Sequence, residues 1–254
     1  GENLKEFKNE IIFNKVSYSY PDSKKKALNN LSISIKKGSI IAFVGPSGSG
    51  KSTLFDLLVK SKLPVSGDIL IDKKNYNKIS LSSIRKLFAY APQNTHLLGD
   101  KISSHILYGN KNEADTNKIS NAIKLAGADE FISALSENIN SKIGSDGSNF
   151  SGGERQKLDL SRTIYSDKAI LLLDEPTSNL DQFSEEIIIS TLNKIKSQNK
   201  TIIISAHRLT TSIKADIIFV FSKGNVTHSG DHNFLMKNCV WYKNAWNGSN
   251  YDNV

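Results

Sequence analysis

The chain has 254 residues, 38% of them hydrophobic, with 33 lysines and arginines against 25 acidic residues and a formal net charge of +8. Its apolar runs fall far short of the about 20 residues that a membrane helix needs, which excludes a span within this chain. The single cysteine, Cys239, excludes an internal disulfide and a zinc site built from several cysteines. The positive charge is compatible with a polyanionic ligand. However, the lysines are scattered and no aromatic residues interleave with them, so we expect no nucleic-acid partner.

The first part of the sequence alternates between strand and turn patterns. Residues 11–20 and 31–35 show the period-two alternation of half-buried strands. Residues 39–45 form a continuous apolar run that predicts a buried strand, and residues 50–60 continue as a helix. A further strand is expected at 68–71, with a polar turn after it.

The middle of the chain is dominated by helical patterns. Apolar residues recur at spacings of three and four in 117–127, and helices are also expected at 129–139 and 153–165. We interpret this region, about 94–166, as a helical subdomain inserted into an α/β core.

Strands and helices then alternate again. Strands are expected at 169–175, 200–207 and 215–224, with a helix at 184–196. Several apolar strands separated by helices imply a mostly parallel sheet, with ligand chemistry at the carboxyl ends of its strands. The chain end, 248–254, is expected to be frayed.

A glycine-rich segment, GPSGSGKST, directly follows the buried strand and fits the pattern G-x-x-x-x-G-K-[ST]. Its backbone can wrap tightly enough for successive N–H groups to point at phosphate oxygens, and the next helix adds its partial positive charge. Lys51 is expected to reach the β- and γ-phosphates and Ser52 to ligate Mg²⁺. A plain turn would not explain Gly-Lys-Ser-Thr at this spacing. The predicted phosphate-binding residues are Gly45, Pro46, Ser47, Gly48, Ser49, Gly50, Lys51, Ser52 and Thr53.

Two adjacent carboxylates follow the apolar run AILLL, which begins at residue 169. Asp174 is placed to hold Mg²⁺ through water, and Glu175 is placed to polarise a water opposite the γ-phosphate. The alternative is a pair of acids stabilised by the dipole of a following helix.

These motifs occur in a characteristic order. The phosphate loop, NFSGGERQK (149–157), LLLDEPTSNLD (171–181) and SAHR (205–208) have the order and approximate spacing of an ATP-binding cassette (ABC) ATPase. FSGGE (150–154) is similar to the LSGGQ signature, which no other P-loop class carries. The resemblance covers nearly the whole chain and implies one ABC ATPase domain over residues 1–254. Its expected fold is an α/β P-loop NTPase with a mostly parallel core sheet, an antiparallel β subdomain and an inserted helical signature subdomain.

The resemblance assigns roles to further residues. Tyr20 stands where the family places the aromatic ring that stacks on adenine, although a core tyrosine at a strand edge is the alternative. Gln93 matches the glutamine that contacts Mg²⁺ and senses the γ-phosphate, unless it is an ordinary loop residue. Asp181 matches the loop that crosses to the opposite subunit. His207 matches the switch histidine that orders the catalytic water, so the predicted catalytic pair is Glu175 and His207.

Members of this family dimerise head to tail, so the resemblance implies that the signature of one copy closes over the ATP bound by a second copy. Ser151, Gly152, Gly153 and Glu154 are therefore expected to belong to the ATP-binding set, with the helix start directed at the γ-phosphate. Glu154 replaces the common glutamine, and Ser145 stands where exporters have a glutamate that couples to the membrane domain.

The resemblance implies the nucleotide-binding domain of an exporter similar to bacterial peptide, toxin and lipid exporters, hydrolysing ATP with Mg²⁺ at the cytoplasmic face of the bacterial inner membrane. Met236 is the only methionine, so residue 1 is not an initiator. We therefore expect a segment of a longer protein whose transmembrane domain is absent from this chain. The expected partners are that domain, on the same or another polypeptide, and a second nucleotide-binding domain in an ATP-dependent dimer.

Two other functions are compatible with an ABC fold. A soluble ABC ATPase acting on DNA or ribosomes is the alternative, but this sequence has neither a long coiled coil nor a second cassette. A nucleotide-binding module without hydrolysis is disfavoured by Glu175 and His207, which are both present. The sequence does not indicate the transported substrate.

Overall fold

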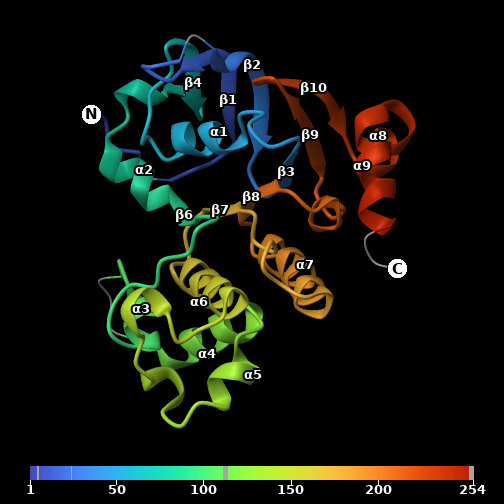
Figure 1. Ribbon diagram of the computed structural model, residues 1–254. Helices are drawn as coiled ribbons and strands as arrows, with labels where there is room; N and C mark the ends of the chain where they lie inside the picture. Colours follow the sequence, from blue (N-terminus) through green and yellow to red (C-terminus); the bar gives the residue numbers. More distant parts are fainter. Residues whose placement is uncertain (5, 24, 111–113, 252–254) are drawn as a thin grey trace.

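The computed structural model describes residues 1–4, 6–23, 25–110 and 114–251 (Figure 1). Its core sheet has the strand order β10-β9-β3-β8-β7-β6. The strands from β9 to β6 run parallel to their neighbours, and β10 pairs antiparallel with β9. In that order the strands are β10 (Asn225–Gly230), β9 (Ile217–Ser222), β3 (Ile40–Val44), β8 (Thr201–Ala206), β7 (Ile170–Asp174) and β6 (Phe88–Ala91).

A second, antiparallel sheet has the order β2-β1-β4-β5. It consists of β1 (Glu10–Ser19), β2 (Lys26–Lys36), β4 (Ser66–Ile71) and β5 (Lys74–Asn75). The strand predicted at 31–35 is longer than expected, because its first residues also pair with β1. The predicted polar turn after β4 contains β5, which pairs back onto β4.

The first hydrophobic cluster lies between the two sheets. Helix α1 (Lys51–Leu58) packs there, with α2 (Leu81–Leu87) beside it and the short 3₁₀ helix η1 (Tyr76–Lys78) nearby. The ring of Phe43 from β3 stacks on Phe219 at a centroid distance of 5.5 Å. Phe43 also meets the ring of Phe55 edge-on at 6.4 Å, and this aromatic contact packs α1 against β3.

The opposite face of the core sheet is covered by α7 (Gln182–Lys196), α8 (His232–Asn238) and α9 (Val240–Tyr251). Alternate residues of β7 and β8 point to this face, because side chains of a strand alternate between the two faces of a sheet. The short helix η4 (Leu209–Ser212) follows β8 and contacts α9.

Four helices and two short 3₁₀ helices enclose a third hydrophobic cluster apart from the sheets, at the bottom of Figure 1. In the described part of the chain these are α3 (Ile102–Leu107), α4 (Thr116–Leu125), α5 (Asp129–Ser133), η2 (Asn138–Asn140), η3 (Ser145–Gly147) and α6 (Gly152–Tyr165). The region is joined to the sheets by β6 at one end and by α6 at the other.

Two sequence predictions of secondary structure are wrong. The helix predicted at 129–139 ends at Ser133, whose hydroxyl donates back to the carbonyls of Asp129 and Glu130. Asn138 then takes a left-handed conformation with φ of 48°, which a continuing right-handed helix does not allow. The chain end predicted as frayed from 248 is helical to Tyr251, and 252–254 lie outside the described residues. Every helix in the described part of the chain is too short or too polar to cross a bilayer.

Candidate active site

The phosphate-binding segment wraps around the ammonium group of Lys51. Lys51 Nζ donates to the carbonyl oxygens of Gly45 at 2.7 Å and Pro46 at 3.1 Å. Gly45 has φ of 148°, and a Cβ at this position would lie 2.3 Å from the carbonyl oxygen of Phe221. Gly50 has φ of 112° directly before α1. Glycine is therefore required at both positions, for backbone conformation and for space.

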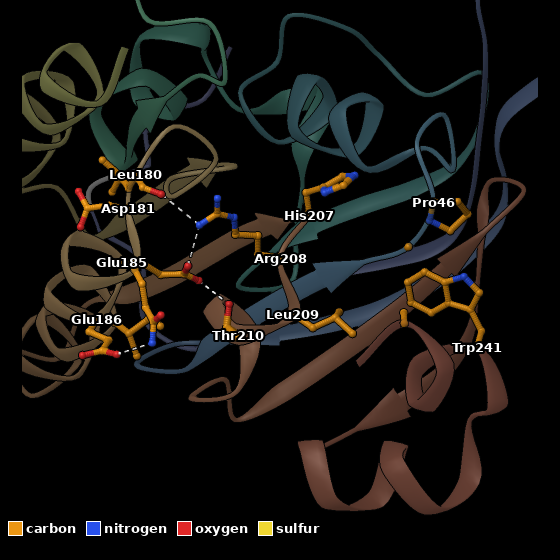
Figure 2. Close-up of a pocket in the computed structure, with 14 residues that line it drawn as sticks. Pro46, Leu180, Asp181, Glu185, Glu186, His207, Arg208, Leu209, Thr210 and Trp241 are labelled. Carbon is orange, nitrogen blue, oxygen red and sulfur yellow. Dashed lines mark hydrogen bonds and ion pairs between the residues drawn. The ribbon is translucent and has the colours of Figure 1, made fainter. Parts of the chain in front are cut away.

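A cavity of about 590 Å³ lies over this segment. It brings together residues that are far apart in the sequence, because the carboxyl ends of parallel strands meet at one edge of a sheet. Its lining includes the predicted residues Tyr20, Ser47, Gly48, Ser49, Gly50, Lys51, Ser52, Thr53, Gln93, Glu175 and His207. Gly45 and Pro46 line a neighbouring cavity of about 730 Å³, together with Asp181 and His207 (Figure 2).

The two carboxylates at the end of β7 differ in their surroundings. Asp174 is buried, and burial raises the pKa of its carboxyl, while hydrogen bonds from the Ser205 and Tyr90 hydroxyls lower it. Glu175 has a left-handed backbone with φ of 51°, and its amide donates to the carbonyl of Ser205 at 2.8 Å. Gln93 Nε2 donates to Glu175 Oε2 at 2.8 Å. Gln93, two residues after the end of β6, therefore contacts the predicted catalytic carboxylate at the cavity.

Lys51 faces these same carboxylates. Burial lowers the pKa of the Lys51 ammonium, and the charges of Glu175 and Asp174 oppose that shift. An ammonium group held by loop carbonyl oxygens at the cavity can donate charge-assisted hydrogen bonds to an anion such as a phosphate group.

Tyr20 lies at the far end of the phosphate-binding segment. Its hydroxyl is 3.1 Å from Thr53 Oγ1, and Tyr18 packs edge-on against its ring at a centroid distance of 5.3 Å. Lys62 Nζ lies 5.4 Å from the centre of the ring. The Tyr20 side chain is nevertheless exposed and lines the cavity over the phosphate-binding segment. Part of its ring surface is therefore open to a planar group.

The signature forms a capping box at the start of α6. Ser151 Oγ accepts a hydrogen bond from the Glu154 amide at 3.2 Å, and Glu154 Oε2 accepts one from the Ser151 amide at 2.7 Å. The Glu154 carboxylate, predicted to belong to the ATP-binding set, thus satisfies the backbone of its own helix. The Ser151 hydroxyl hydrogen stays available as a donor.

The signature lies apart from the cavity over Lys51. Ser151, Gly152, Gly153 and Glu154 line a cavity of about 480 Å³ that they share with Asp181. Asp181 also caps α7, because its Oδ1 accepts from the Ser184 amide at 2.9 Å. The hydrogen bonds from Ser184 lower the pKa of the Asp181 carboxyl. Within the described residues, the phosphate-binding segment and the signature therefore do not line one cavity.

Sequence reasoning missed Gln156, which joins the signature helix to the predicted catalytic residue. Gln156 Nε2 donates to the carbonyl of Glu175 at 2.7 Å, and Gln156 Oε1 accepts from the Asn179 amide at 3.3 Å. The only feature of the sequence that could have indicated Gln156 is its position within the signature segment NFSGGERQK. Ser145 lies in η3, beside a separate small cavity that Gln93 also lines.

The residues predicted to hold Mg²⁺ offer oxygen atoms, which this hard cation prefers. They are Ser52, Gln93 and Asp174. Within the described residues no group of three or more histidine, cysteine or acidic side chains could enclose a metal. The donor set fits Mg²⁺ bound by few side chains together with phosphate oxygens, which is how this ion is usually held.

A family model described as "ABC transporter" matches residues 28–178, more than half of the chain. The chain belongs to the ABC transporter family. The predictions of family and of an α/β P-loop fold are thereby confirmed, as is the assignment to the ATPases of this family.

Relatives of the ABC family with high similarity are named as transporters. The mitochondrial "Iron-sulfur clusters transporter ATM1" of Chaetomium globosum is 40% identical over 93% of this chain and 39% of its own length. The "ATP-dependent lipid A-core flippase" of Vibrio vulnificus is 37% identical over 91% of this chain and 39% of its own length. The structure of a bacterial Atm1-family ABC exporter with ATP bound matches with a TM-score of 0.91 at 34% identity, covering 97% of this chain and 43% of that one. The chain thus spans about two fifths of these relatives, and the alternative of an ATPase acting on DNA or ribosomes is not favoured.

Proposed function

We propose that this chain is the motor domain of an ABC exporter, which hydrolyses ATP and thereby powers transport across a membrane. The convergence of Lys51, Glu175, Gln93 and His207 on one cavity supports this function most directly. We infer further that residues 1–254 form one ATPase domain with a helical subdomain at about 94–166.

ATP would be held by the phosphate-binding segment, with its base against the open part of the Tyr20 ring. The amides of this segment and the start of α1 would bind the phosphates. The Lys51 ammonium, which now contacts two loop carbonyls, would turn to the β- and γ-phosphates. Mg²⁺ held near Ser52, Gln93 and Asp174 would neutralise charge on the phosphates.

Hydrolysis requires a group that activates water. Glu175 serves as that base, since its carboxylate lies at the cavity and can accept a proton from a water aimed at the γ-phosphate. His207, at the end of β8, contacts the γ-phosphate and orders the water. In the present arrangement Gln93 donates to Glu175 Oε2, which leaves Oε1 to accept the proton.

The separation of the signature from the phosphate-binding segment supports a site shared between two copies. The Ser151 hydroxyl and the amides at Gly152 and Gly153 would bind the γ-phosphate of ATP held by a second domain. Gly152 and Gly153 line the signature cavity of about 480 Å³, so an approaching group can reach them there. A head-to-tail, ATP-dependent dimer, in which Asp181 also faces the second copy, completes both sites.

The names of the relatives suggest the wider assembly. Since they are called transporter, flippase and exporter, we propose that the chain acts with a transmembrane domain, on the same or another polypeptide. Its place would be the cytoplasmic face of a membrane, the bacterial inner membrane in our proposal. No nucleic-acid partner is proposed.

ATP hydrolysis by the 254-residue chain tests the function. We expect Mg²⁺-dependent turnover that falls by about 100-fold or more in Glu175→Gln, because removal of a general base typically costs 10²–10⁴-fold. ATP binding by this variant should persist, and it should accumulate as a dimer in size-exclusion chromatography with ATP. Glu130→Gln, an exposed acid on α5, is the matched control. Turnover of Glu175→Gln equal to that of the control would overturn the catalytic assignment.

A further inference from the structure

A buried carboxylate outside the phosphate site joins two segments that border it. Glu185 lies in the first turn of α7 and is only 6% exposed. Figure 2 shows it between Leu180 on one side and the segment that follows His207 on the other. It lines the cavity of about 730 Å³ and not the cavity over Lys51. Glu185 therefore has no direct place in the nucleotide site described above.

Three donors from the segment after His207 meet this carboxylate. Arg208 Nη1 donates to Glu185 Oε2 at 3.0 Å, Thr210 Oγ1 donates to Oε1 at 2.5 Å, and Thr211 Oγ1 donates to Oε1 at 3.0 Å. A buried carboxylate is stable only when such hydrogen bonds replace its water. The segment and the carboxylate thus depend on each other.

In the described part of the chain, the His207 side chain makes no hydrogen bond that would fix the position of this residue. Its imidazole has no hydrogen-bond partner within the residues that the structure describes, and it points away from Glu185 in Figure 2. Its position is therefore set by the backbone on either side. Strand β8 fixes the residue before it, and the hydrogen bonds to Glu185 fix the residues after it.

Glu185 also belongs to the segment that carries Asp181. Asp181 is the N-cap of the same helix, and Arg208 Nη1 donates to the carbonyl of Leu180 at 3.1 Å as well as to Glu185. A hydrogen bond of 2.7 Å between the Thr177 and Thr211 hydroxyls adds a second connection. A displacement of the segment at 178–181 would consequently be transmitted to the backbone that positions His207.

We propose that Glu185 is a positioning residue for His207, and that it couples the placement of His207 to that of the 178–181 segment. The inference rests on the proposed function, in which His207 orders the catalytic water and Asp181 faces a second copy. In a closed dimer, contact at Asp181 would then place His207 through Glu185, Arg208 and Thr210.

Glu185→Gln tests this role in the 254-residue chain. The amide keeps the shape of the side chain but presents one acceptor in place of two, so the donors of Arg208 and Thr210 cannot both be matched. Small misplacements of catalytic groups can lower rates by about 100-fold, and we expect kcat for ATP hydrolysis to fall by about tenfold or more. KM for ATP should change by less than about threefold, since Glu185 does not line the cavity over Lys51. Glu186→Gln, the same change at the exposed neighbouring residue, should leave both values unchanged.

A double-mutant cycle with His207→Ala distinguishes positioning from a general loss of structure. If Glu185 acts through His207, Glu185→Gln will not lower the remaining rate of His207→Ala further, and the two effects will be strongly non-additive. Equal fold losses in both backgrounds would overturn the inference while leaving the proposed function intact. Full turnover of His207→Ala would instead overturn the role of His207 in the proposed function.

Thr210→Val provides a second variant should Glu185→Gln fail to fold. It removes one donor to Glu185 and keeps the volume of the side chain. The same non-additivity with His207→Ala is expected, with a smaller fall in kcat because Arg208 and Thr211 still donate. Additive losses for this variant would contradict the inference in the same way.

Discussion

Gln93 and Glu175 are joined by a hydrogen bond of 2.8 Å from Nε2 to Oε2. The two residues follow neighbouring parallel strands, β6 and β7, at the edge of the sheet where the cavity over Lys51 opens. Because the chain passes from Gln93 into the helical part, this bond links the start of that part to the carboxylate proposed to activate water.

Replacement of Gln93 by alanine should affect the response to Mg²⁺. We expect Gln93→Ala to lower kcat for ATP hydrolysis by about tenfold and to raise the Mg²⁺ concentration for half-maximal activity, because the variant lacks the oxygen proposed as a ligand. Asn94→Ala, a change at the exposed next residue, is the control. An unchanged Mg²⁺ titration for Gln93→Ala would contradict its assignment as a ligand.

A substitution at Gly152 tests the shared site, because it is expected to lower ATP turnover without lowering the stability of the fold. A Cβ there would lie 3.6 Å from Asn179, an ordinary contact, so Gly152→Ala should unfold in urea at the same free energy or up to about 1 kcal/mol higher. ATP turnover should nevertheless fall by about tenfold or more, since the methyl group occupies the surface proposed to meet the phosphate of a second copy. Gly248→Ala, which places a methyl group in open space on α9, should keep full turnover. Full activity of Gly152→Ala would argue against the shared site.

The capping box at Ser151 makes a prediction about stability. Ser151→Ala removes the acceptor for the Glu154 amide and should lower the free energy of unfolding by about 1 kcal/mol. Glu154→Gln retains an oxygen that can accept from the Ser151 amide, so its cost should stay below about 0.5 kcal/mol. Urea unfolding of the unchanged protein, Ser151→Ala and Glu154→Gln measures these free energies. A loss of stability in Glu154→Gln as large as that in Ser151→Ala would show that the charge, not the hydrogen bond, matters.

Contiguous motifs account for what the sequence predicted well. The phosphate-binding segment needs glycine at particular backbone angles next to a strand and a helix, so nearly all of its geometry is local. Glu175 is placed at the cavity by the strand that precedes it, and the buried Asp174 is the last residue of that strand. The apolar patterns of 39–45 and 169–175 likewise gave the parallel core.

Contacts across the fold were beyond sequence reasoning. Nothing in the residue types of Gln156 or Glu185 indicates that one reaches the backbone of Glu175 and the other the segment after His207, because both contacts depend on how α6 and α7 pack against the sheet. Strand β6 was missed for a related reason. At four residues, Phe88–Ala91 is too short to show a period, and its pairing with β7 decides its conformation.

The buried His105 predicts a dependence of stability on pH. Its Nδ1 accepts from the Leu98 amide, and burial together with the Arg162 charge lowers the pKa of the imidazole from 6.5 to about 4. The unfolded chain binds the proton first, so stability is full above pH 6.5 and is lost as pH falls towards 4. The loss amounts to about 3 kcal/mol at 1.36 kcal/mol per pKa unit.

A comparison of the unchanged protein with His105→Asn tests this effect. Asp159, 3.6 Å from His105 Nε2, opposes the trend because burial raises the pKa of its carboxyl, but Asp159 is present in both proteins. His105→Asn keeps an acceptor for Leu98 and removes the titration. Urea unfolding across this interval should therefore show a shallower pH profile for the variant, and parallel profiles would mean that His105 takes up its proton in the folded protein as readily as in the unfolded chain.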